Sequence, residues 1–238
     1  TIGVTSSTSA ISIAANGIVT LVDDLLLKDA CTIGTATTAG AIAIAADGTV
    51  DLDVAGATVA SAVIKTAGKE SIWVPAAAMY PSTTNPCADL EQVETTALRP
   101  DLKVLDFATG ADEFAQFTVA FPKSWNEGTV TFQPFWTVTG TNTGTVAWGL
   151  SGIAVTNDAT INTAFGTAAV TTALAHSGTS NDLMVSVESG AITIGGSPST
   201  DDVCFFQVNR DVSADAQSGD ARLIGIKVFF TTDAANDA

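Results

Sequence analysis

Few residues of this chain are of the types that catalyse reactions or bind metals. Its 238 residues include one histidine, three cysteines and 25 acidic side chains. A single histidine excludes a multi-histidine zinc or haem site within the chain. His176 is followed by Ser177 and Asp182, but triads are assembled by spatial geometry rather than adjacency, and ALAHSGTSND is typical of a polar loop. Glycan cleavage needs two opposed carboxylates, and none here stands in an apolar setting that would raise its pKa. We therefore expect no enzymatic activity, cofactor or metal.

Arg210 and Arg222 flank an acidic loop that contains Asp211, Asp215 and Asp220. If the two arginines end paired strands, each can bind a loop carboxylate and so brace the tip of a long hairpin. A calcium site is the alternative, because hard cations take several carboxylates and loop carbonyls. The spacing lacks the pattern of a known calcium loop, which favours bracing.

Four tryptophans could provide stacking platforms for sugars. Trp136 and Trp148 alternate in phase with apolar neighbours, which predicts core positions. Trp125 lies in the connection PKSWNEG, where a strand has just ended, and it is our candidate for surface contact. The alternative is that its ring packs under that turn. Trp73 is the first aromatic residue of the chain.

The net charge of −16 excludes several partners. An acidic surface repels phosphate backbones and anionic lipids, so we expect no nucleic acid and no membrane surface as partner. No run of about 18 apolar residues is present, so we expect no membrane insertion. Cys31, Cys87 and Cys204 are far apart, and we interpret them as buried small hydrophobic residues of a protein assembled in a reducing cytoplasm.

The first part of the chain repeats itself. TIGVTSSTSAISIAANGIVTL begins at Thr1, and TIGTATTAGAIAIAADGTVDL begins at Thr32, 31 residues later. Asn-Gly in the first copy and Asp-Gly in the second supply the positive φ angles of a tight turn, so each copy predicts a hairpin. The apolar positions of the two copies form one thin stripe: Ile11, Ile13, Val19, Leu21, Ile42, Ile44, Val50 and Leu52.

Two such units cannot bury enough surface to fold alone. Either further copies lie upstream in a single-chain solenoid, or the same stripe from other chains closes the core. We expect the second arrangement, a homotrimer, with the eight stripe residues as the oligomer interface. An ordinary hairpin-rich domain is the remaining alternative.

Changes of composition along the sequence predict three segments: a hairpin-repeat stalk over 1–68, a linker or irregular entry segment over 69–101, and a β-sandwich over 102–238. The middle segment is rich in proline and small polar residues. The last contains at least seven or eight short alternating strands, which predicts an all-β fold with a jelly-roll-like sandwich. Pro134 predicts an edge or interrupted strand, and the phase change at Ser151-Gly152 predicts a bulge.

One resemblance accompanies these patterns. FPKSWNEGTVTFQPFWT, then VAWGL, AFGTA, RDVSADAQSGDARLIG and a final aromatic strand, resembles a C-terminal domain common in fibre and virion proteins of tailed bacteriophages and prophages. The DGT-type hairpin repeats resemble those that precede such domains in phage and marine viral proteins. The resemblance covers roughly residues 32 to 231. It implies a structural component of the virion, assembled in the host cytoplasm and exposed on the particle surface, of the tail-fibre or appendage type.

We therefore expect a homotrimeric, non-enzymatic virion appendage that presents a β-sandwich for attachment. Its expected partners are copies of itself, other virion proteins, and a glycan or protein of the host surface. The alternatives are a capsid decoration protein, a bacterial surface adhesin or filament subunit, and a glycan-hydrolysing spike.

Overall fold

The computed structural model describes residues 68–232, together with the backbone of five short strands before them. The chain divides into two compact units, 1–62 and 63–238. Along these described stretches no helix is both long and apolar enough to cross a membrane.

The first unit contains antiparallel strand pairs. β1 (Ile11–Ile13) pairs with β2 (Val19–Leu21), and β4 (Ile42–Ile44) pairs with both β3 (Thr32–Ile33) and β5 (Val50–Asp51). These pairings agree with the two predicted hairpins. The side chains of the eight stripe residues, and all of Leu52, lie outside the described residues, so the oligomer interface stays a prediction.

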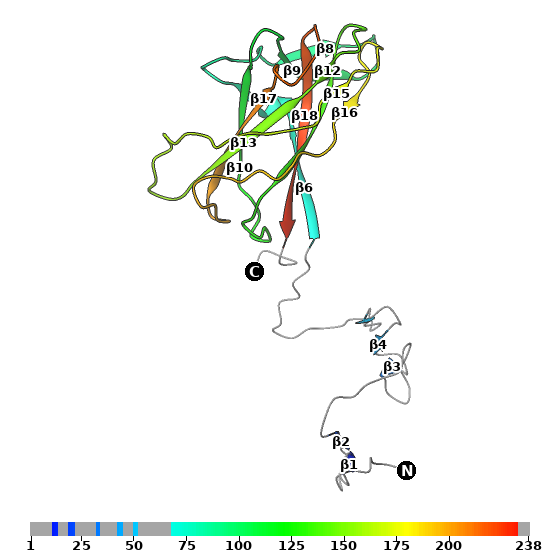
Figure 1. Ribbon diagram of the computed structural model, residues 1–238, viewed down its shortest axis with the longest axis vertical. Helices are drawn as coiled ribbons and strands as arrows, with labels where there is room; N and C mark the ends of the chain where they lie inside the picture. The colour runs from blue at the N-terminus through cyan, green and yellow to red at the C-terminus, as the bar shows by residue number, and fades with distance from the viewer. Residues whose placement is uncertain are drawn as a thin grey trace. The chain divides into compact units, whose positions relative to one another are not determined.

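The second unit consists of two main antiparallel sheets (Figure 1). The five-stranded sheet has the order β14-β13-β17-β10-β7, and the six-stranded sheet has the order β16-β11-β18-β9-β8, with β6 also paired to β18. A small third sheet pairs β12 with β15. The elements are β6 (Gly68–Pro75), η1 (Ala76–Ala78), β7 (Tyr80–Pro81), β8 (Glu91–Glu94), β9 (Asp101–Phe107), β10 (Phe114–Val119), β11 (Thr131–Thr137), β12 (Thr145–Val146), β13 (Trp148–Val155), β14 (Ala169–Val170), β15 (Leu174–Ala175), β16 (Met184–Val185), β17 (Val203–Arg210) and β18 (Ala221–Thr232).

Side chains from both sheets meet in one core. Phe107 of β9 contacts Trp148 of β13 edge to face, with ring centroids 5.1 Å apart. Phe121, which follows β10, lies 6.2 Å from Phe206 of β17 and 5.5 Å from Phe230 of β18. These rings join the two layers, which confirms the predicted all-β sandwich for the second unit. The chain crosses repeatedly between the sheets, as it does in jelly rolls.

The segment 69–101 is part of the sandwich, which corrects the predicted linker. β6 pairs with β18 over eight positions, from Gly225 opposite Pro75 to Thr232 opposite Gly68. β8 pairs with β9, and β7 with β10. The prolines of this stretch lie at strand ends and in the connections, where a missing N–H costs no ladder bond.

The two predictions about strand irregularity had different outcomes. β11 shifts register between Phe135 and Trp136, next to Pro134, so that strand is interrupted as expected. β13 pairs with β17 in one continuous register from Trp148 to Val155, so the predicted bulge is wrong. Ile153 is buried, and the chain at Gly195 pairs with the strand there and lies against its side chain.

The pairing of β6 with β18 fixes how the chain enters the sandwich. Gly68 opposes Thr232, so the segment before residue 68 joins at that end of the six-stranded sheet. Arg222, near the start of β18, opposes Thr137 and Asp106 at the far end. In Figure 1, β6 and the last part of β18 run side by side at the end of the sandwich where β6 begins and β18 ends.

Candidate functional site

The outer face of the six-stranded sheet carries an exposed tryptophan. Lys69, Ser71 and Trp73 alternate along β6 with the better buried Ile72 and Val74, so Trp73 points away from the core. The indole covers Gly225 of β18, where an added Cβ would approach Trp73 Cζ2 to 2.6 Å. Trp73 is nevertheless 45% exposed. One side of the indole therefore packs against the sheet, and the remainder faces solvent.

Phe135 and Lys227 support the indole from the neighbouring strands. Phe135 stands perpendicular to Trp73, with ring centroids 5.1 Å apart and an interplanar angle of 87°. Lys227, the cross-strand partner of Trp73, places its Nζ 5.5 Å from the Phe135 centroid. Gln133, opposite Lys227 on the other side, donates from Nε2 to the Ser186 carbonyl at 3.0 Å. We call Trp73, Gln133, Phe135, Gly225 and Lys227 the Trp73 face.

Polar and aliphatic side chains border the Trp73 face. Glu188 accepts hydrogen bonds from Lys69 and from Thr131. Lys69 also places its Nζ 4.9 Å from the centroid of Phe229. On the edge formed by β16 and its flanks, three aliphatic residues are 40–60% exposed: Leu183, Val185 and Val187.

A groove of about 670 Å³ lies beside the Trp73 face. Ile224 contributes to its floor and precedes Gly225, which the indole covers. The remaining lining comes from the turn between β8 and β9, the start of β9, and the segment before β16: Thr95, Thr96, Arg99, Pro100, Leu102, Ser180, Asn181 and Leu183.

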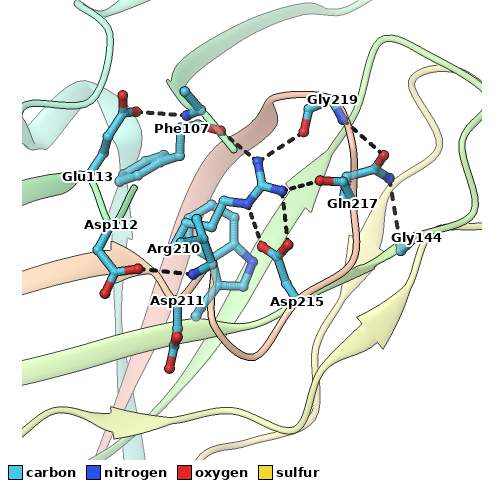
Figure 2. A network of polar contacts seen from close by, with 12 residues as sticks. Phe107, Asp112, Glu113, Gly144, Arg210, Asp211, Asp215, Gln217 and Gly219 are labelled. Carbon is cyan, nitrogen blue, oxygen red and sulfur yellow. Dashed lines mark hydrogen bonds and ion pairs between the residues drawn. The ribbon is translucent and has the colours of Figure 1, made fainter. Parts of the chain in front are cut away.

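Arg210 forms a buried polar network where the chain crosses from β17 to β18 (Figure 2). Its guanidinium donates to both Asp215 carboxylate oxygens, from Nε at 2.5 Å and from Nη2 at 3.1 Å. The other three N–H groups reach the carbonyls of Phe107, Gly219 and Gln217 at 3.0, 2.9 and 2.6 Å. All five donors of the guanidinium are thus used, in a side chain that is fully buried. The predicted bracing of the acidic loop is confirmed for Arg210.

Arg222 does not brace that loop, which corrects the second half of the prediction. Its Nε donates to Asp106 of β9 at 3.0 Å, and its Nη2 lies 3.7 Å from Glu91 of β8. β17 and β18 belong to different sheets, so residues 211–220 form a crossing connection rather than a hairpin tip. Burial raises the pKa of Asp106, although Arg222 acts in the opposite direction, which corrects the expectation that no carboxyl group stands in a setting that raises its pKa.

The structure does not support surface contact by Trp125. Its side chain is 2% exposed and packs on Phe121, with ring centroids 4.3 Å apart. The connection folds back on β18, because Trp125 forms a bridge with Thr232 and the Asn126 amide donates to the Thr231 carbonyl at 3.0 Å. The alternative, a ring packed under the turn, is what the structure shows.

The residues around His176 do not form a catalytic triad. Ser177 donates directly to Asp182 at 2.7 Å, whereas the buried His176 uses Nδ1 in a 3.1 Å contact with the Asn142 carbonyl. Within the part of the chain that the structure describes, no three acidic, histidine or cysteine side chains are grouped to hold a metal ion.

Two of the three cysteines agree with the prediction of buried hydrophobic residues. Cys87 and Cys204 are free thiols and are 4% and 0% exposed. Burial raises the pKa of each thiol to about 12, with smaller contributions from nearby carboxylates. Cys31 lies outside the described residues.

Sequence reasoning missed Trp73 as a site residue, although a signal was present. In GKESIWVP the tryptophan shares its phase with Lys69 and Ser71 rather than with Ile72 and Val74. An aromatic residue in the polar phase of an amphipathic strand predicts exposure. The groove was not predictable, because its walls come from segments about 80 residues apart.

Comparisons with known proteins give a fold-level likeness only. No protein-family model and no curated protein matches the sequence. Among solved structures, the chain is similar to CBM35 from Cellvibrio japonicus Abf62, with 9% identity, a TM-score of 0.40, and coverage of 70% of this chain and 100% of that one. It is also similar to a family 11 carbohydrate-binding module from Clostridium thermocellum in complex with a mixed-linked tetrasaccharide, with 9% identity, a TM-score of 0.34, and coverage of 76% and 95%.

Proposed function

We propose that the chain is a non-enzymatic virion appendage of the fibre or spike type, whose β-sandwich contacts surface carbohydrate through the Trp73 face. The observation that carries the proposal is the position of Trp73. Its indole is fixed against Gly225 and beside Phe135, yet the residue remains 45% exposed on the outside of a sheet.

The chemistry of the Trp73 face suits a sugar ring. An indole presents a flat apolar surface with a negative face, which attracts the weakly positive C–H groups of a pyranose. Lys227 and Gln133 lie one and two strands from Trp73 in the same row, where they can form hydrogen bonds with ring hydroxyls. The fixed position of the indole limits the entropy that is lost on binding.

The acidic side chains support a binding role over a hydrolytic one. A glycosidase needs one carboxyl group kept protonated and a second one opposed to it across the substrate. Here Asp215 binds Arg210, Asp106 binds Arg222, and Glu188 binds Lys69. None of the three lines the groove or belongs to the Trp73 face.

The trimeric stalk remains part of the proposal. A contact made by one tryptophan is weak, so attachment requires several copies that act together, and avidity raises the overall affinity without a deeper pocket. The hairpin repeats of residues 1–68 are the segment that we propose to join the copies, through the apolar stripe from Ile11 to Leu52.

The test is a glycan-binding measurement on the full-length protein and two variants. Trp73→Ala is expected to weaken binding to the glycans that the parent retains by at least about tenfold, which corresponds to about 1.4 kcal/mol. Tyr80→Ala is the matched control, because Tyr80 is 48% exposed but belongs to the five-stranded sheet. Equal binding by the parent and Trp73→Ala, or an equal loss in both variants, would contradict the proposal. Release of reducing ends from a bound glycan would contradict the non-enzymatic role.

A further inference from the structure

We propose that the groove beside the Trp73 face is a subsite for a carboxylate-bearing sugar, of the uronic or sialic type. The inference rests on the proposed function, because it takes the ligand to be a saccharide, and it adds the class of sugar. It depends on the charge of the groove, on the hydrogen bonds that its hydroxyl groups already make, and on the conformation of the two segments that form its walls.

Among the described residues that line the groove, Arg99 is the only charged one. The ion pairs of residues 68–232 involve Lys69, Arg210 and Arg222 but not Arg99. Arg99 is an exposed residue, whereas Arg210 is buried and uses all five donors of its guanidinium within the protein. A planar guanidinium matches a carboxylate with two parallel hydrogen bonds, so a ligand carboxylate is the complementary group.

The hydroxyl groups of the groove are oriented to accept hydrogen bonds. Thr95 Oγ1 donates to the Pro100 carbonyl at 3.0 Å, Thr96 Oγ1 to the Thr95 carbonyl at 2.7 Å, and Ser180 Oγ to the Thr139 carbonyl at 2.6 Å. Each hydroxyl has one proton and two lone pairs, so while these bonds are kept the three oxygens can accept from a ligand. Ring hydroxyls of a sugar supply such donors. A carboxylate peptide offers fewer of them per unit length.

Apolar residues form the rest of the groove, and its volume suits a small ligand. Pro100, Leu102 and Ile224 can pack against the C–H face of a pyranose. The volume of about 670 Å³ lies within the range of about 300–1,000 Å³ that is usual for ligand sites. The combination of one guanidinium, several acceptor oxygens and an apolar floor fits one acidic sugar and its neighbour.

The two wall segments are held in defined conformations. Leu98 and Asn181 both have φ of 63°, in the left-handed region that Leu rarely adopts. The Arg99 amide donates to the Thr96 carbonyl at 3.0 Å, and the Asn181 amide donates to the Val138 carbonyl at 3.0 Å. These bonds fix the backbone positions of Arg99 and Asn181, and uncommon φ angles of this kind concentrate at binding sites.

The groove adjoins the Trp73 face, so one oligosaccharide can occupy both. Ile224 in the floor precedes Gly225, which the indole covers. Leu183 in the wall shares its phase with Val185, the cross-strand partner of Phe135. Trp73 would then hold a sugar of either charge type, and Arg99 would select for the acidic one.

The test compares acidic saccharides with their neutral counterparts on the full-length protein. The probes are oligogalacturonate against the same oligomer with its carboxylates reduced to alcohols, and sialyl-lactose against lactose. Affinities are measured by calorimetry at about 0.15 M salt, where charges beyond about 8 Å are largely screened. The parent is expected to bind at least one acidic probe about tenfold or more tightly than its neutral counterpart.

Two variants with the same loss of charge identify the residue responsible. Arg99→Gln is expected to abolish the preference for the acidic probe while the affinity for the neutral one is retained. Lys103→Gln, an exposed cation of β9 outside the groove lining, should leave the preference intact. Equal binding of acidic and neutral probes by the parent, failure to bind either acidic probe, or an equal effect of the two variants would overturn the inference.

Further outcomes distinguish this inference from the proposed function. If Trp73→Ala weakens the acidic and neutral probes alike but the parent shows no preference, the proposed function stands and the inference fails. If polyglutamate binds in an Arg99-dependent manner and no acidic saccharide binds, the groove recognises peptide carboxylates, and the inference is overturned.

Discussion

Removal of the Asp215 carboxylate is predicted to cause a large loss of stability. In Asp215→Ala the fully buried guanidinium of Arg210 keeps its three carbonyl partners but loses both carboxylate oxygens. Two N–H groups, at Nε and Nη2, are then left without an acceptor. At about 1–3 kcal/mol for each unsatisfied buried donor, the loss is about 2–6 kcal/mol. Breaking a buried ion pair by removing one partner generally costs about 3–5 kcal/mol, which agrees with this range.

Urea denaturation of the full-length protein measures this loss. All four tryptophans lie between residues 73 and 148, so their fluorescence reports on the sandwich and not on the hairpin repeats. With an m-value of about 2–3 kcal/mol/M, a loss of 3–5 kcal/mol lowers the urea midpoint by about 1–2.5 M.

Two control variants separate burial from charge. Asp220→Ala removes a carboxylate from an exposed position in the same connection. Lys69→Ala breaks the Lys69–Glu188 pair, whose side chains are 50% and 33% exposed, and such pairs contribute about 0–1 kcal/mol. If Asp215→Ala loses less than about 1 kcal/mol, no more than these controls, then Arg210 is not a buried charge that depends on Asp215, and the reasoning fails.

Two further predictions follow from the shifted pKa values. Burial raises the thiol pKa of Cys87 and Cys204 to about 12, so both thiols should resist alkylation at about pH 8 in the folded protein and react in urea. Peptide mass spectrometry measures the alkylation. Labelling of either thiol in the native state would contradict the burial. The folded protein holds the proton of Asp106 more tightly than the unfolded chain does, so the contribution of Asp106 to stability is full below its ordinary pKa of 3.8 and is lost as pH rises through the raised value. Urea midpoints of the parent and Asp106→Asn between about pH 3.5 and 7 test this, and the parent should lose stability relative to the variant as pH rises; parallel curves would refute it.

The parts of the fold that could be predicted are those set by local alternation. Short strands with apolar residues in every second position specify which side faces a core, so the all-β class and the sandwich could be derived from residues such as Phe117, Trp136 and Trp148. The Asn-Gly and Asp-Gly turns similarly predict the pairing of β1 with β2 and of β4 with β5 in the first unit, but not that of β3 with β4.

The errors occurred where burial is decided by a distant part of the chain. The sequence predicts a linker where β6 lies, because the partner strand β18 is about 150 residues further along. Trp125 follows a strand in a polar turn, and only the return of that turn onto the end of β18 encloses it. Ile153 is buried by the chain at Gly195 rather than by a change of strand phase. No local pattern in the sequence indicates that these distant segments bury β6, Trp125 and Ile153.

The Arg210 network also bears on the groove, through a chain of contacts. Gln217, whose carbonyl accepts from Arg210, donates from Nε2 to the Asn142 carbonyl at 3.1 Å. The same carbonyl lies 3.1 Å from Nδ1 of His176, the residue just before the segment that carries Ser180 and Asn181. A buried ion pair is a weak source of stability, because well-packed apolar side chains can replace it. The Arg210–Asp215 pair also fixes the position of the connection between β17 and β18, whose Gln217 contacts the chain beside one wall of the groove. Loss of Asp215 should therefore weaken the preference for acidic sugars more than it weakens sugar binding at Trp73. Trp73 lies in β6, and the pairing of β6 with β18 holds that strand in place.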